Sequence, residues 1–185
     1  MIEAKNLSLV FLIIVGGMIA LIIFSLKDPA SKRILQHRVP ELLGNVEARI
    51  DRLRFFEKNP GKPEWELSAD KVQILEKESH TSLTNLHLTL VSTDKRTMKV
   101  KAQEGELENS SKNIEISGDV EITSDDGYVF QTEKLFWNAV KQEISTPTEV
   151  RLTGPNLLLS GDELLGYAQS QVFELKHVKA VFESY

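Results

Sequence analysis

The stretch IEISGDVEITSDDGYVFQTEKL, residues 114–135, alternates apolar and polar residues on both sides of a short turn. In an extended strand, alternate side chains point to the same face, so four apolar residues of the first half lie together: Ile114, Ile116, Val120 and Ile122. Gly118 leaves a gap on that face. The DDG sequence at 125–127 lacks the twelve-residue ligand set of a calcium loop and is typical of a hairpin turn. The stretch therefore predicts a β-hairpin that buries one side of a sheet.

The same pattern recurs along the chain. Segments 98–123, 128–153 and 157–182 align over 26 residues each, and 65–90 is a looser copy. Equivalent positions share their character in three columns of residues: Val100, Phe130 and Leu159; Ile114, Ile144 and Phe173; Ile122, Leu152 and Val181. Each unit consists of a strand, a short polar turn and a second strand. Repeated hairpins of this length predict an all-β antiparallel protein: a sandwich, a jellyroll or a roll of stacked hairpins.

The alternation begins near residue 46 and slips by one position between Ile50 and Leu53. We interpret this slip as a β-bulge in the first strand. The β domain is accordingly expected to cover residues 46–185, with a polar connector at 27–45.

The N-terminal region contains an uncharged apolar segment, LSLVFLIIVGGMIALIIFSL at 7–26. Twenty helical residues are long enough to cross about 30 Å of hydrocarbon. A signal peptide is the alternative, but its apolar region is shorter and ends in a small-x-small cleavage site, whereas Asp28 interrupts this exit. We expect an uncleaved single transmembrane helix, with residues 1–6 as a short tail. Because long soluble domains translocate largely regardless of charge, the positive-inside rule leaves the orientation open.

Charge and composition restrict the possible partners. Residues 27–56 carry seven basic and four acidic side chains, whereas 57–185 carry 14 basic and 22 acidic ones. A basic segment next to a membrane is attracted to anionic headgroups, and an acidic domain disfavours nucleic acid as a partner. The chain has no cysteine, which excludes disulfides and thiolate metal sites.

No arrangement of residues indicates catalysis or a cofactor. The histidines at 37, 80, 87 and 177 lack metal-ligand spacing. The sequence contains no nucleophile elbow and no glycine-rich phosphate loop. The glycines at 154, 161 and 166 are typical of turns and sheet bends. We therefore expect neither an enzyme nor a bound metal or cofactor.

An apolar sheet face can close into a core or remain partly open and hold an acyl chain. The candidate groove residues are Val100, Ile116, Val120, Ile122, Phe130, Leu152 and Leu159. Packing of these side chains on one another is an equally good interpretation of the pattern.

Five segments resemble the LptC family of lipopolysaccharide export proteins: EWELSADKV at 64–72, VKAQEGEL at 100–107, IEISGDVEITSDDGYVFQTEKLFW at 114–137, ISTPTEVRLTG at 144–154 and LLSGDELLG at 158–166. Together with the N-terminal anchor, the resemblance extends over essentially the whole chain. It implies a short cytoplasmic tail, an inner-membrane anchor and a periplasmic domain with the fold of an antiparallel β-jellyroll.

The resemblance also implies partners. A protein of this family receives lipopolysaccharide from the ABC transporter of LptB, LptF and LptG and passes it to LptA through a groove of β-jellyrolls. Unpaired sheet edges could mediate such contacts by strand addition. The N-terminal candidates are Leu53, Phe55 and Trp65, expected to face the transporter, and the C-terminal candidates are Val178, Ala180 and Phe182, expected to face LptA. A membrane-tethered structural adaptor that recruits its partner through edge strands without binding lipid remains the alternative.

Overall fold

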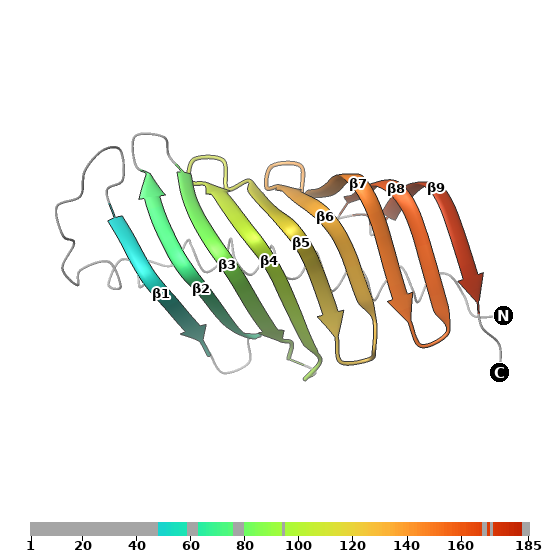
Figure 1. Ribbon diagram of the computed structural model, residues 1–185, viewed down its shortest axis with the longest axis horizontal. Coiled ribbons are helices and arrows are strands. Elements are labelled where there is room, and N and C mark those ends of the chain that lie inside the picture. Colours follow the sequence, from blue (N-terminus) through green and yellow to red (C-terminus); the bar gives the residue numbers. More distant parts are fainter. Residues whose placement is uncertain are drawn as a thin grey trace.

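The computed structural model describes residues 48–58, 63–75, 80–93, 95–167, 170 and 172–182. They form nine strands: β1 (Ala48–Glu57), β2 (Glu64–Leu75), β3 (His80–Val91), β4 (Thr97–Glu108), β5 (Ile114–Ser124), β6 (Val129–Asn138), β7 (Glu143–Gly154), β8 (Leu157–Tyr167) and β9 (Val172–Phe182). Each strand pairs antiparallel with the next, in one sheet of order β1 to β9 (Figure 1). The prediction of an all-β antiparallel, jellyroll-like fold is confirmed.

The expected transmembrane helix at 7–26 and the connector at 27–45 lie outside the described residues. Among the residues that are described, no helix has the length and apolar character needed to cross a membrane.

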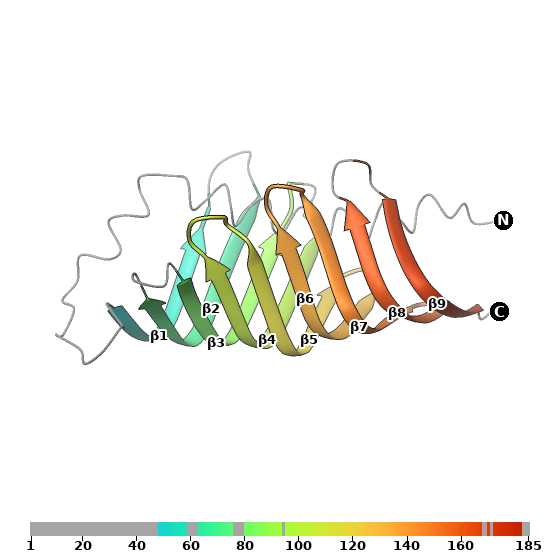
Figure 2. The same ribbon diagram turned by 90° about the horizontal axis from the view of Figure 1, so that it is seen from above.

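The sheet is folded over on itself into a trough (Figure 2). Each strand bends near its middle, and at five of these bends a residue other than glycine has a left-handed backbone: Arg52, Asn85, Asp119, Glu163 and His177. A residue in this conformation turns the backbone of the strand sharply at that point. Lined up across the sheet, the bends form a corner that separates two walls.

Each wall contains one tryptophan, which gives it its name here. The Trp65 wall comprises residues 53–57, 64–69, 86–91, 97–102, 120–124, 129–132, 149–154, 157–161 and 178–182. The Trp137 wall comprises residues 48–51, 71–75, 80–84, 104–108, 114–117, 134–138, 143–146, 164–167 and 172–176. Most apolar side chains of both walls point into the trough, and these form one buried cluster.

The slip in the first strand is such a bend, and the expected β-bulge there is wrong. Asp51 pairs with Lys71 and Leu53 with Ala69, so the register is the same on both sides of Arg52. Arg52 has a left-handed backbone, with φ of 58°. The residues that face inward therefore change from even-numbered before Arg52 to odd-numbered after it, without an inserted residue. True register shifts occur further along, where β5 and β7 each have one residue more than their neighbours at the corner.

Polar side chains join the strands where the backbone ladder is interrupted at the corner. Asn85 Nδ2 donates to Asp70 Oδ2 at 2.8 Å, and Gln103 Nε2 donates to Asp119 Oδ2 at 2.7 Å. Strands β6 and β7 are joined by a hydroxyl cluster of Thr132, Thr146 and Thr148. Thr132 Oγ1 also donates to the Glu149 carbonyl at 2.9 Å. The bond to the Glu149 carbonyl satisfies a backbone group at the bend, and the others join side chains of adjacent strands.

The predicted columns of equivalent residues hold in two cases and fail in part in the third. Val100, Phe130 and Leu159 all point inward, as do Ile114, Ile144 and Phe173. Ile122 and Leu152 are buried, but Val181 is 56% exposed, because it lies opposite the outward Leu158. The bend at His177 changes which residues of β9 face inward, from odd-numbered to even-numbered. Ala180, opposite the inward Leu159, therefore takes the position expected for Val181.

We expect Gly118→Ala to destabilise the fold by about 2 kcal/mol, because Gly118 has φ of +77° and an added Cβ would lie 2.7 Å from Gln103 Cβ. Gly127→Ala is the matched control, since φ is +88° there but the nearest atom is 3.6 Å away, on Pro155. Urea denaturation of both variants separates the two effects: a loss at Gly118 no larger than at Gly127 would show that the contact with Gln103 is unimportant.

Candidate functional site

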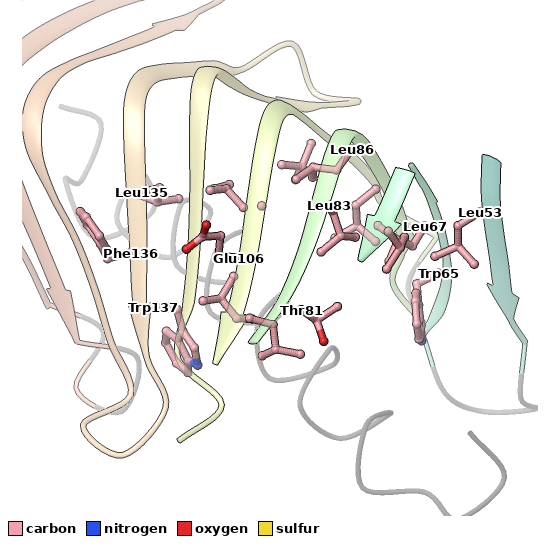
Figure 3. Close-up of a pocket in the computed structure, with 17 residues that line it drawn as sticks. Leu53, Trp65, Leu67, Thr81, Leu83, Leu86, Glu106, Leu135, Phe136 and Trp137 are labelled. Carbon is pink, nitrogen blue, oxygen red and sulfur yellow. The ribbon is translucent and has the colours of Figure 1, made fainter. Parts of the chain in front are cut away.

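An apolar cavity lies between the two walls in the half of the trough nearest β1 (Figure 3). Its volume is about 210 Å³. Strands β1 to β6 contribute its lining, which consists of Leu53, Trp65, Leu67, Val72, Thr81, Leu83, Leu86, Leu88, Val100, Gly105, Glu106, Leu107, Ile114, Ile116, Leu135, Phe136 and Trp137. Because nearly all of these side chains are aliphatic or aromatic, the cavity can shield a hydrocarbon chain from water.

The cavity exists because side chains at this end of the trough do not reach across it. Leu53, Leu67 and Leu83 are only half-buried, although they point inward. Further along the trough Phe130, Val150 and Leu164 are 3%, 2% and 5% exposed, and they pack in the buried cluster without lining this cavity. We call the region around Phe130, Val150 and Leu164 the packed half, to distinguish it from the region that contains the cavity.

The seven predicted groove residues all face the interior of the trough, but only two of them line the cavity. Val100 and Ile116 line the cavity. Val120, Ile122, Phe130 and Leu152 are buried in the packed half or at its border, and Leu159 is half-buried there. Lipid contact by these residues remains a prediction, and for the packed ones it requires the walls to separate.

Several cavity residues were missed from the sequence: Leu67, Leu83, Leu107, Leu135 and Trp137. Strict alternation would place Leu83 on the face opposite Leu86, and Leu135 on the face opposite Phe130, because the bend at Asn85 and the register shift in β6 change which residues face inward. The alternation also could not reveal which inward residues are separated by empty space.

The outer face of the Trp137 wall is acidic where β4 and β5 meet. Glu106 lies opposite Glu115, and the Lys134 ammonium lies 2.5 Å from Glu115 Oε1. That hydrogen bond, helped by the charges of Glu115, Glu106 and Glu104, raises the pKa of Lys134. In the adjacent turn, hydrogen bonds led by that from Ser111 lower the pKa of Glu108. An anionic headgroup would be repelled from this outer face, whereas an uncharged chain inside the trough is not affected.

Both edges of the sheet lack a neighbouring strand among the residues that the structure describes. At the first edge Leu53 and Phe55 point inward and are half-buried, and the Phe55 ring packs on Trp65 of β2 with centroids 4.9 Å apart. Trp65 itself is buried and lines the cavity, and its strand β2 pairs with both β1 and β3, so it does not lie at the edge. At the last edge Val178 and Phe182 are 50% and 73% exposed, and Ala180 is also exposed. Exposed apolar residues on an unpaired strand are typical of a site for strand addition.

The side chains in the described part of the chain provide no group of three or more histidine, aspartate or glutamate residues able to hold a metal ion.

A family model described as "Lipopolysaccharide-assembly, LptC-related" matches residues 10–183. The chain belongs to the LptC family. The resemblance found in the sequence is thereby confirmed, and it places this LptC-family chain in lipopolysaccharide transport, as a component of the periplasmic bridge that serves outer-membrane biogenesis.

Among solved structures, this LptC-family chain is similar to LptH of Pseudomonas aeruginosa, described as the LptA homologous periplasmic component of the conserved lipopolysaccharide transport device. The TM-score is 0.48 at 8% identity, over 65% of this chain and 95% of the LptH chain. No curated protein matches the sequence.

Proposed function

We propose that this chain is the inner-membrane-anchored periplasmic subunit that receives lipopolysaccharide from the LptB, LptF and LptG transporter and passes it to LptA through the inside of the trough. The observation that carries the proposal is the apolar cavity, which lies in the half of the trough next to the β1 edge. Acyl chains entering there would be shielded by both walls, while the phosphorylated sugars remained in water.

The apolar segment at 7–26 would act as the anchor, with residues 1–6 in the cytoplasm and the β domain in the periplasm. The β1 edge would then face the transporter through Leu53 and Phe55, with Trp65 supporting them from β2. The β9 edge would face LptA.

A proline scan at the β9 edge tests the second contact. In an antiparallel ladder adjacent residues direct their N–H groups to opposite sides, so that one of Lys179 and Ala180 donates toward β8 and the other toward the free edge. Proline removes the donor. Proline at the residue whose N–H faces the free edge should weaken binding to LptA about tenfold and leave stability unchanged. Proline at the residue whose N–H donates to β8 should reduce stability. Equal LptA binding by wild type and both variants in a pull-down would place the contact elsewhere.

The packed half of the trough favours a second candidate, an adaptor that pairs edges and never carries lipid. Phe130 is 3% exposed and is enclosed by its own core. In a bridge this region must open as lipid passes, whereas in an adaptor it stays closed.

A photocrosslinking residue at Phe130 in the intact cell distinguishes the two functions, with one at the exposed neighbour Gln131 as control. The bridge predicts lipopolysaccharide adducts at 130 and few at 131. Adducts to protein alone at both positions, in cells that still export lipopolysaccharide, would favour the adaptor.

A further inference from the structure

The indole N–H of Trp137 lies in the buried interior without a hydrogen-bond acceptor among the described residues. The side chain is 4% exposed. Buried donors of this kind are rare in folded proteins, because each gives up its bond to water without replacement. Tryptophan is otherwise suited to places where an apolar ring meets one polar partner.

The position of Trp137 relates this donor to the cavity. Trp137 is the last residue but one of β6 and pairs with Ile114 on one side and Ile144 on the other, so it lies at the rim of its wall, far from the corner. It lines the cavity, and Figure 3 shows the indole nitrogen on the side of the ring turned toward Thr81. The Thr81 hydroxyl donates its own proton to Asn109 Oδ1 at 3.1 Å.

Neighbouring atoms cover the nitrogen, so a ligand reaches it only when the ring or its cover shifts. A ligand that both fills the cavity and pairs this donor is apolar along its length and carries a hydrogen-bond acceptor at one end. An acyl chain meets both conditions, since its carbonyl oxygen follows directly on the hydrocarbon. An alkyl ether has the same hydrocarbon but a weaker acceptor.

We propose that Trp137 Nε1–H donates a hydrogen bond to an acyl carbonyl oxygen of the bound lipid and so sets the depth at which the chain stops in the cavity. The proposal rests on the proposed function, because it assumes that the cavity accepts lipid. Trp137 is then a selectivity residue for ester- or amide-linked chains, while the leucines of the lining bind any hydrocarbon.

The test compares two lipids with the same headgroup, didodecanoyl phosphatidylglycerol and its didodecyl ether counterpart. Both are titrated against the full chain held in an amphipathic polymer, which supplies no competing lipid. The chain has two tryptophans, so ¹⁵N-labelled indole gives two N–H signals, and Trp137→Phe assigns them. We expect the ester lipid to move the Trp137 signal downfield and the ether lipid to move it much less.

Affinities provide the second measurement. Trp137→Phe removes the donor but keeps an aromatic ring, and we expect it to weaken binding of the ester lipid about 2- to 10-fold and to leave the ether lipid unchanged. An unchanged Trp65 signal in the variant serves as the control for folding.

Two results would overturn the proposal while leaving the proposed function intact: an ester lipid that binds without moving the Trp137 signal, and a variant that weakens both lipids equally. If neither lipid binds the wild-type chain, the proposed function fails as well.

Discussion

Replacing Val120 by aspartate should unfold the domain or reduce its free energy of unfolding by at least about 3–5 kcal/mol. Val120 is 1% exposed, in the part of β5 just after the corner, where the core of the packed half begins. A carboxylate there would lose its water and find no cation, since its neighbours in the buried cluster are hydrocarbon side chains. Urea denaturation of the full chain, followed by tryptophan fluorescence, measures the loss.

Val140→Asp is the matched control. Val140 is 85% exposed in the turn between β6 and β7, so the same chemical change should alter stability by less than about 0.5 kcal/mol. If Val120→Asp were as stable as Val140→Asp, the packed half of the trough would have to be open to water.

Leu83→Trp should abolish most lipid binding while leaving the fold intact. Leu83 is half-buried in β3 and lines the cavity, so the larger indole at this position would project into the space that an acyl chain would use. Because the new ring enters existing space, the cost in stability should stay within about 1 kcal/mol, whereas affinity for an acyl lipid should fall at least about tenfold. Equilibrium titration of the full chain with lipopolysaccharide measures the change.

Leu158→Trp makes the same replacement on the outer face of the Trp65 wall, where Leu158 is 46% exposed. It should leave lipid affinity unchanged. An equal loss of affinity in both variants would indicate that lipid binds the outer surface, and undiminished binding by Leu83→Trp would place the lipid outside the cavity.

Residues 114–135 show how far alternation alone can predict this fold. Two-residue periodicity correctly predicts the faces of Ile116, Val120 and Phe130, because that periodicity is a property of any extended backbone. It predicts straight strands, however, and the trough arises from bends. Asn85 and His177 adopt left-handed backbones there. Asparagine and histidine favour this conformation, but the residue type alone does not mark a bend, because Asn138 and His87 lie in strands without it.

The same limit applies to the site. Val100 and Phe130 look equivalent in the repeat, yet Val100 lines the cavity and Phe130 closes the packed half. The difference depends on how far apart the two walls lie, which is set by packing between residues distant in sequence. Trp137 illustrates the point further, since its unpaired indole N–H becomes evident only when every neighbour is placed.

The most direct test of the account is the order in which lipid reaches two positions along the trough. Photocrosslinking residues at Leu83 in the cavity and at Phe130 in the packed half would be placed singly in full chains assembled with the transporter in membrane vesicles. After addition of ATP, we expect lipopolysaccharide adducts to appear first at Leu83 and later at Phe130, with none at the outward neighbour Thr84. Adducts at Phe130 without earlier adducts at Leu83, or no lipid at either position during active export, would contradict it.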